Sequence, residues 1–312
     1  MTEPLQPESA SGRDVESLSF VERRNIHPIL FAFLSLVVVF VLYQVGGGVI
    51  TFLLLNGTKI NPENVYLLRL FTMLGQIFLI FVPTLILARL LSTRWKAVFP
   101  LRTPSWRESI AAVIGLLSLQ RVFEVYIYFQ DNIPIPDALR KLIDPIRQML
   151  DEMVKELLQS NSIFEFLFVI TVVAFVPAIV EEFLFRGLVQ NSFNRSMKPL
   201  TAAIFTGIIF GLFHLNPFEA VPLIGIGCFL SFLRYRSVSL ILPIFLHFLN
   251  NFLAVIAETF KMGDEKIMMA PTTDRPGILI LLAQLFIFGG LFVASLRFYI
   301  QSTVGLVGEP HD

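Results

Sequence analysis

The sequence is poor in charged residues and has almost no cysteine. Only 15% of its 312 residues are Asp, Glu, Lys or Arg, while 55% are hydrophobic. A soluble protein of this size needs more charge to cover its surface. The single cysteine, Cys228, excludes an intrachain disulfide and a cysteine-based metal cluster. The formal net charge is zero, so the charge balance does not point to nucleic acid, and we expect no nucleic-acid partner.

The apolar residues are gathered in long blocks. The blocks that begin at His27 and Val65 each exceed the roughly 20 residues that a helix needs to cross a bilayer. The sequence therefore predicts an all-α, polytopic helical membrane protein with about eight transmembrane helices. The expected spans are 28–55, 65–91, 108–129, 161–190, 199–216, 218–234, 238–260 and 276–299.

The connection from Asp131 to Ser160 has a different pattern. Apolar residues recur there at helical spacing and charged residues occupy the other positions, which predicts an amphipathic helix at the membrane interface or a lid over the domain. The apolar set is Leu139, Leu142, Ile143, Ile146, Leu150, Met153, Val154 and Leu157. Pro145 is expected to kink this helix or to split it in two.

The chain is predicted to form one membrane domain between two polar tails. Residues 1–27 carry both charge signs, unlike a signal peptide, and we expect them to be disordered. Residues 28–300 form the domain, with the functional core at about 160–255, and residues 301–312 form a polar C-terminal tail. An arrangement of eight spans with both termini in the cytoplasm places more Lys and Arg inside than outside, and this orientation is expected.

The first polar cluster in an apolar helix is the pair Glu181 and Glu182. A charged side chain near the bilayer centre costs about 2.5–3.5 kcal/mol. Glu182 and Arg186 are four residues apart, so a helix would place them on one face as an ion pair. Glu181 has no basic residue three or four positions away and is left for general-base chemistry. Alternatively, the whole unit is a polar clamp between helices. Pro177 is expected to bend the helix and open a wet cavity.

The second and third clusters each contain a histidine. Gly207 and Gly211 have the spacing that lets two helices approach closely. His214 follows on the same face, with Phe210 one turn before it to hold the imidazole ring. In the third cluster, His247 and Asn251 are four residues apart, and Asn250 lies beside that edge. Each cluster alone is also typical of a structural hydrogen-bond network.

Together, the clusters supply a carboxylate, two imidazoles and an amide, the side chains of a hydrolytic site. The order EExxxR, FxxxH, HxxxN on successive apolar helices resembles the CAAX prenyl endopeptidase family, which includes CAAX proteases and bacteriocin-processing enzymes. The matching residues are Glu181, Glu182, Arg186, Phe210, His214, His247 and Asn251, and the resemblance covers about residues 160–255.

The resemblance implies a glutamate-type intramembrane protease without a cofactor. Glu181 and His214 would activate a water molecule, His247 and Asn251 would stabilise the oxyanion, and Glu182 with Arg186 would support the site. The implied partners are membrane lipid and a protein or peptide substrate that is prenylated or otherwise membrane-anchored. The expected location is a bacterial inner membrane, or the endoplasmic reticulum membrane in a eukaryote.

The same residues also allow alternative functions. A zinc-dependent version would use Glu181, His214 and His247 as ligands with an open fourth position. The cluster could instead serve a non-catalytic scaffold or a protein that binds lipid or prenylated peptide, or it could form a small transport path. Other intramembrane proteases are disfavoured, because the sequence has no HExxH motif, no GxGD motif and no glycine-flanked serine elbow.

Overall fold

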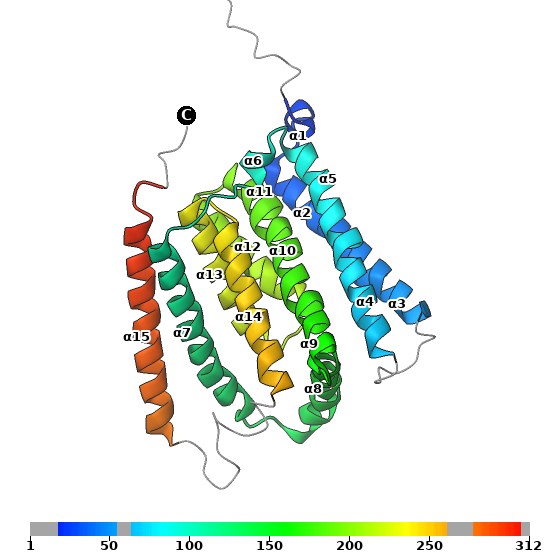
Figure 1. Ribbon diagram of the computed structural model, residues 1–312, viewed down its shortest axis with the longest axis vertical. Coiled ribbons are helices and arrows are strands. Elements are labelled where there is room, and N and C mark those ends of the chain that lie inside the picture. The colour runs from blue at the N-terminus through cyan, green and yellow to red at the C-terminus, as the bar shows by residue number, and fades with distance from the viewer. Residues whose placement is uncertain (1–17, 55–63, 261–276, 307–312) are drawn as a thin grey trace, which may run out of the picture.

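The computed structural model describes residues 18–54, 64–260 and 277–306, and in these parts the chain is helical with no strand (Figure 1). Six helices there are long and apolar enough to cross a membrane. They are Pro28–Leu53, Val65–Leu91, Trp106–Asp131, Ile163–Asn194, Ile241–Thr259 and Ile278–Ser302. The predicted all-α, polytopic membrane fold is therefore confirmed.

The first two spans are each interrupted by a π-helical segment, in which the backbone hydrogen bonds skip one extra residue. The first consists of α2 (Pro28–Phe40), η2 (Val41–Gly47) and α3 (Gly48–Leu54). The second consists of α4 (Val65–Gly75), η3 (Gln76–Phe81) and α5 (Val82–Leu91). The short helix α6 (Trp95–Val98) follows.

Helices α7 (Trp106–Asp131) and α15 (Ile278–Ser302) pack along each other at one edge of the molecule (Figure 1). A capping box starts α7, in which the Ser105 side chain and the Glu108 side chain each bind the other's backbone N–H. Small residues on α7 allow close packing. A Cβ at Gly115 would lie 2.8 Å from the Phe229 ring and 2.9 Å from Ser295 Oγ.

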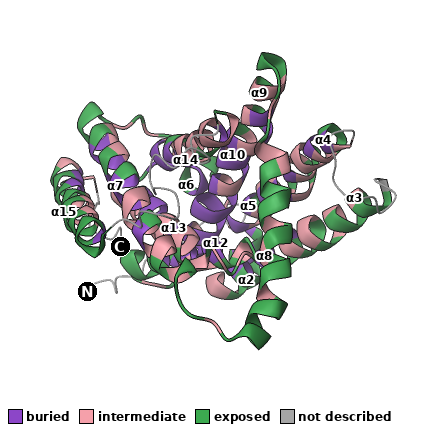
Figure 2. Cartoon of the chain, turned by 90° about the horizontal axis from the view of Figure 1, so that it is seen from below, coloured by how far each residue is buried: buried purple, intermediate pink, exposed green. Residues whose placement is uncertain are grey.

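The long span Ile163–Asn194 carries the carboxylate pair. It consists of α9 (Ile163–Val169), η4 (Ile170–Phe175), α10 (Val176–Glu182), η5 (Phe183–Val189) and α11 (Gln190–Asn194). Two π-helical segments thus lie on either side of α10. Buried residues concentrate in α10 and η5, and Figure 2 shows them at the centre of the bundle between α5 and α12.

Helices α12 (Pro199–Phe213) and α13 (Ala220–Ser237) form a tight hairpin, and α14 (Ile241–Thr259) follows. All eight predicted spans are helical, but α12 and α13 are not among the six that satisfy length and composition for crossing. At 1.5 Å per residue, α12 is roughly 22 Å long, shorter than the hydrocarbon core. The number of transmembrane helices therefore stays a prediction. The short α12 brings its last residues to the middle of the bundle.

The predicted amphipathic helix is α8 (Asp137–Leu158), which lies across the lower end of the bundle (Figures 1 and 2). None of its side chains is buried, and its apolar residues Leu142 and Met149 are more than 60% exposed. The helix continues through Pro145, so the expected split does not occur. Buried Arg69 fixes its last turn by donating to the carbonyl oxygens of Glu156 and Leu157.

Parts of both predicted tails are ordered. Within the tail assigned to residues 1–27, α1 (Phe20–Arg23) has a Ser19–Glu22 capping box, and Val21 is buried. The expectation of disorder is therefore wrong for residues 18–27, because Val21 packs into the core and Glu22 lies 3.5 Å from Arg195. Residues 1–17 lie outside the described residues. In the C-terminal tail, Thr303 is buried and accepts a bond from Arg236, while residues 307–312 lie outside the described part.

Candidate active site

The predicted ion pair on the carboxylate helix is present and fully buried. Arg186 Nη1 lies 2.6 Å from Glu182 Oε1, and both side chains have 0% exposure. The guanidinium also donates to the carbonyl oxygen of Gly227 at 2.9 Å and to Ser231 Oγ at 3.2 Å. Its Cζ lies 4.4 Å from the centre of the Phe210 ring, a cation–π contact. Arg186 thus joins α10 and η5 to α12 and α13.

His247 is bound to the same carboxylate oxygen. Its Nδ1 lies 2.9 Å from Glu182 Oε1, and the imidazole side chain is 6% exposed. Arg186 donates to this oxygen, which therefore acts as an acceptor, so His247 Nδ1 donates to it as well. In a neutral ring, Nε2 then carries the lone pair. It becomes a donor only when the ring is an imidazolium ion.

Glu181 lies between the two histidines. Its Oε2 is 3.8 Å from His214 Nε2 and 3.9 Å from His247 Nε2, and its side chain is 18% exposed. The same oxygen is buried and has no hydrogen-bond partner among the described residues. Both separations exceed a hydrogen bond. Glu181 is therefore the unpaired carboxylate that the sequence predicted, with two imidazole nitrogens directed at one of its oxygens.

The backbone and an aromatic ring hold His214 in this orientation. Its Nδ1 lies 2.7 Å from the Phe210 carbonyl oxygen, which accepts, so Nδ1 donates and a neutral Nε2 is free to accept a proton. The Phe210 ring packs edge-on against His214, with 4.7 Å between ring centres, and against His247, with 5.7 Å. Leu215, the next residue, has a left-handed backbone with φ of 54°, which ends α12 and turns the chain away.

Asn251 lies on α14, one turn beyond His247. Its Nδ2 donates to the carbonyl oxygen of Val173 at 3.0 Å, and its Oδ1 accepts from Asn250 at 3.2 Å. Asn250 in turn accepts from Gln120 Nε2 on α7 at 2.9 Å. The side-chain amide of Asn251 therefore keeps one Nδ2 hydrogen that these contacts do not use.

The zinc alternative uses Glu181, His214 and His247 as ligands. Their oxygen and nitrogen atoms are of a suitable type, but they lie farther apart than the ligand atoms of one zinc ion. Ligand atoms around tetrahedral zinc stand about 3.3–3.5 Å apart, because each lies about 2.0–2.2 Å from the ion. The distances from Glu181 Oε2 to the two imidazoles are 3.8 and 3.9 Å. Within the described ranges, no group of three His, Cys, Asp or Glu residues is arranged to hold a metal ion.

The motifs did not reveal two polar residues of the first spans that also face this region. Tyr43 in η2 lies beside Gln76 in η3, and η3 packs against α10, the helix that carries Glu181. Gly75 makes room for the ring, since a Cβ there would lie 3.3 Å from a Tyr43 carbon. Gln76 Oε1 is buried without a hydrogen-bond partner in the described part of the chain. The one sequence signal for Tyr43 and Gln76 is that both are polar residues inside apolar runs.

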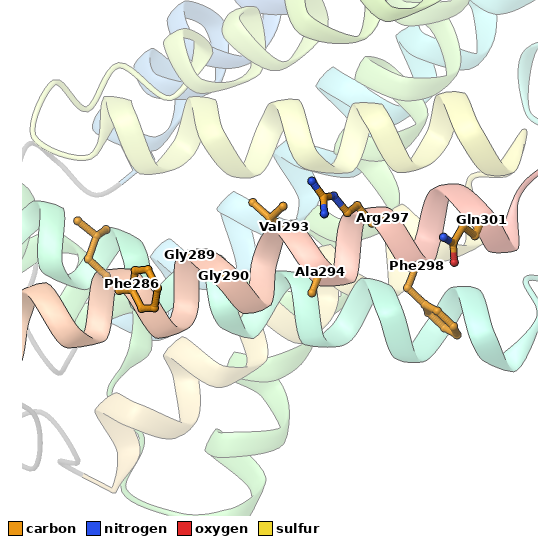
Figure 3. A pocket seen from close by; sticks show the side chains of 9 residues that line it. Phe286, Gly289, Gly290, Val293, Ala294, Arg297, Phe298 and Gln301 are labelled. Atoms are coloured by element: carbon orange, nitrogen blue, oxygen red, sulfur yellow. The ribbon is translucent and has the colours of Figure 1, made fainter.

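A groove along α15 lies apart from these groups (Figure 3). Phe286, Gly289, Gly290 and Val293 line it, and Arg297 stands toward the C-terminal end of α15. It holds no carboxylate or imidazole, and its glycines face open space. The groove is therefore a feature of the outer helix surface and has no chemistry of its own.

The fold and site define a polytopic membrane protein with a carboxylate and two histidines converging inside its helical bundle. Residues 163–253 match the family described as Type II CAAX prenyl endopeptidase Rce1-like. The resemblance drawn from the three motifs is thus confirmed over this segment, which contains every motif residue. No match was found among curated proteins or among solved structures.

Proposed function

We propose that the protein is an intramembrane endopeptidase of the CAAX protease type that hydrolyses a peptide bond with water activated by Glu181. The observation that carries this proposal is the convergence of two imidazole Nε2 atoms on one otherwise unbonded oxygen of Glu181. The family match suggests a protease, and hence a hydrolase with a protein or peptide substrate, but it does not identify that substrate.

The water would be activated by two acceptors. Glu181 Oε2 and the neutral Nε2 of His214 are 3.8 Å apart and cannot bond each other without an added proton. A water molecule that donates to both has its oxygen lone pair free to attack the scissile carbonyl carbon. One water proton passes to Glu181, and the C=O π electrons move to the carbonyl oxygen.

The oxyanion would be stabilised by His247 and Asn251. His247 would donate from Nε2 in its doubly protonated form, with Nδ1 held by Glu182 Oε1. Asn251 contributes its remaining Nδ2 hydrogen. When the tetrahedral intermediate collapses, the C–N bond breaks and Glu181 returns its proton to the leaving amine. The products are a carboxylic acid and an amine, so atoms and charges balance.

We propose a prenylated or otherwise membrane-anchored protein or peptide as the substrate, because the site lies deep within the membrane helices. Glu181 is 13 residues before the end of its span at Asn194, or roughly 20 Å along the helix. We further propose a bacterial inner membrane, with both chain ends in the cytoplasm.

The central test compares new protein termini in membranes of cells that express the wild type or Glu181→Gln at equal abundance. We expect termini that occur only with the wild type, and these would also identify the substrate. Glu181→Gln keeps the shape of the side chain and removes its charge, so the variant should fold normally. Identical termini in the two samples would overturn the proposal and favour the scaffold or lipid-binding alternative.

A chelator separates the metal-free proposal from the zinc alternative. We expect the purified enzyme to keep its rate after treatment with a strong chelator, since Glu181 and the imidazoles act directly on water. Loss of activity that zinc restores would instead assign Glu181, His214 and His247 as ligands.

A further inference from the structure

The HxxxN motif does not act alone, because a chain of side-chain amides reaches Asn251 from a helix outside the matched segment. Gln120 on α7 donates from Nε2 to Asn250 Oδ1 at 2.9 Å. Asn250 donates from Nδ2 to Asn251 Oδ1 at 3.2 Å. Asn251 donates from Nδ2 to the Val173 carbonyl oxygen at 3.0 Å. We propose that Gln120 and Asn250 are positioning residues that orient Asn251 for the oxyanion, an inference that rests on the proposed function.

The direction of the chain determines which end of the Asn251 amide faces each partner. A backbone carbonyl can only accept, so Val173 requires the NH2 group of Asn251. Asn250 presents its own NH2 group, so it requires the oxygen of Asn251. A 180° flip would oppose two acceptors at Val173 and two donors at Asn250. The two contacts therefore fix one amide orientation, and a hydrogen on Nδ2 is left over.

Gln120 fixes the orientation of Asn250 in the same way. Its Nε2 donates to Asn250 Oδ1, which leaves the Asn250 NH2 group to point at Asn251. Without Gln120, the Asn250 amide could turn and offer its oxygen to Asn251. That arrangement would compete with the orientation that Val173 favours.

Asn251 is anchored on the span that carries the proposed base. Its Nδ2 donates to the carbonyl oxygen of Val173 in η4. Pro177, in the next segment, has no backbone N–H to offer to the carbonyl oxygens of η4. The contact ties α14 to the span that carries Glu181, so Asn251 and Glu181 share one support.

Kinetics of Asn250→Leu and Gln120→Leu test this inference on a substrate identified from the wild-type termini. Loss of one typical hydrogen bond, about 1 kcal/mol, corresponds to roughly a fivefold lower rate. We expect about a fivefold fall in kcat with KM unchanged, and no further fall when Asn250→Leu is added to Asn251→Ala. Asn191→Leu is the matched control. Its amide donates to the Ala97 carbonyl oxygen, away from the site, and its kcat should equal that of the wild type.

A merely structural role would give a different pattern. Asn250→Leu would then lower the amount of folded enzyme while kcat per folded molecule stayed the same, or it would lower kcat equally with and without Asn251. Either result would overturn the inference.

A stability measurement tests the Asn250–Asn251 contact on which the inference depends, even if the wild type cleaves nothing. Thermal unfolding of the purified wild type, Asn250→Leu, Asn251→Ala and the double variant forms a double-mutant cycle. The contact predicts that the Tm losses of the single variants do not add, and additive losses would overturn it. Failure of the proposed function would be recognised separately, by identical termini from the wild type and Glu181→Gln.

Discussion

Glu181 and Glu182 are adjacent and chemically identical, yet their surroundings give them different tasks. Glu182 Oε1 accepts from Arg186 and from His247 and has no exposure to solvent. Glu181 has no such partner and keeps 18% of its side chain exposed. Because neighbouring residues of a helix point in different directions, Glu182 enters the buried ion-pair network while Glu181 is left available.

We predict that Glu182→Gln destabilises the protein far more than Glu181→Gln does. The substitution leaves the Arg186 guanidinium buried with no counter-charge in contact. Removing one member of a buried ion pair costs about 3–5 kcal/mol. Thermal unfolding of the purified variants would measure the difference. Equal Tm values for the two variants would show that Arg186 does not depend on Glu182.

An exposed ion pair on α7 provides the control. Arg121 and Glu124 lie 3.0 Å apart, with 37% and 43% of their side chains exposed. Because exposed pairs contribute about 0–1 kcal/mol, Glu124→Gln should change the stability by no more than that. The same chemical change thus has different effects according to burial.

At the scale of single residues, the sequence predicted a contact between side chains four positions apart, but not the contacts between side chains far apart in the chain. The Glu182–Arg186 pair follows from helix periodicity alone. The contacts of Arg186 with Gly227 and Ser231, and that of Gln120 with Asn250, join residues more than 40 positions apart. No spacing rule connects such residues, so only the packing of the helices reveals them.

At the scale of elements, the α12–α13 hairpin depends on glycine. A Cβ at Gly207 would lie 2.3 Å from the backbone nitrogen of Cys228, and one at Gly211 would lie 2.6 Å from that of Ile224. The small-residue spacing read from the sequence therefore marks a close helix contact. The contact positions the end of α12, and with it His214, beside Glu181.

We predict that Gly207→Ala lowers both stability and activity. Backbone atoms of α13 must move to accept the new methyl group, and overpacking of this kind costs about 1–3 kcal/mol. The displacement would also separate His214 from Glu181. Gly289→Ala on α15 is the matched control, since a Cβ there meets nothing within 4 Å. Unfolding and peptide hydrolysis would be measured for both variants, and a wild-type Tm for Gly207→Ala would contradict the tight contact.

The sequence also predicted the bounds of the helices better than the π-helical segments within them. Each predicted span begins and ends within a few residues of an observed helix, because long apolar runs define it. The π-helical segments beside Glu182 and at Tyr43 left no signal, since they depend on how neighbouring helices pack. The continuity of α8 through Pro145 was missed for a related reason. A proline removes one helix bond, but it does not end a helix that has other support.

At the scale of the whole molecule, the two ends of the bundle differ. The loop after α6, the end of α13 and the end of α15 meet at one end, where Arg102 donates to the Ser237 carbonyl oxygen and Arg236 donates to that of Ile300. Helix α8 lies across the opposite end (Figure 1). Between them, exposed apolar side chains such as Phe52, Phe78 and Phe286 cover the helices, as a lipid environment requires.

This arrangement predicts that α6 and the end of α15 are on one side of the membrane and α8 is on the other. Cys228 is the only native cysteine, so Cys228→Ser gives a background for single-cysteine labelling. With the proposed orientation, a membrane-impermeant maleimide should label Glu152→Cys on intact cells. It should label Lys96→Cys and Gln301→Cys only after the membrane is permeabilised.

The labelling separates the fold from its orientation. If all three cysteines react on the same side, α8 does not lie across the opposite end and the packing of the spans is wrong. If Lys96→Cys and Gln301→Cys react on intact cells while Glu152→Cys does not, the fold stands and the orientation is reversed. The excess of Arg and Lys near α6 and the ends of α13 and α15 favours the cytoplasm for that side, because basic loops are retained inside.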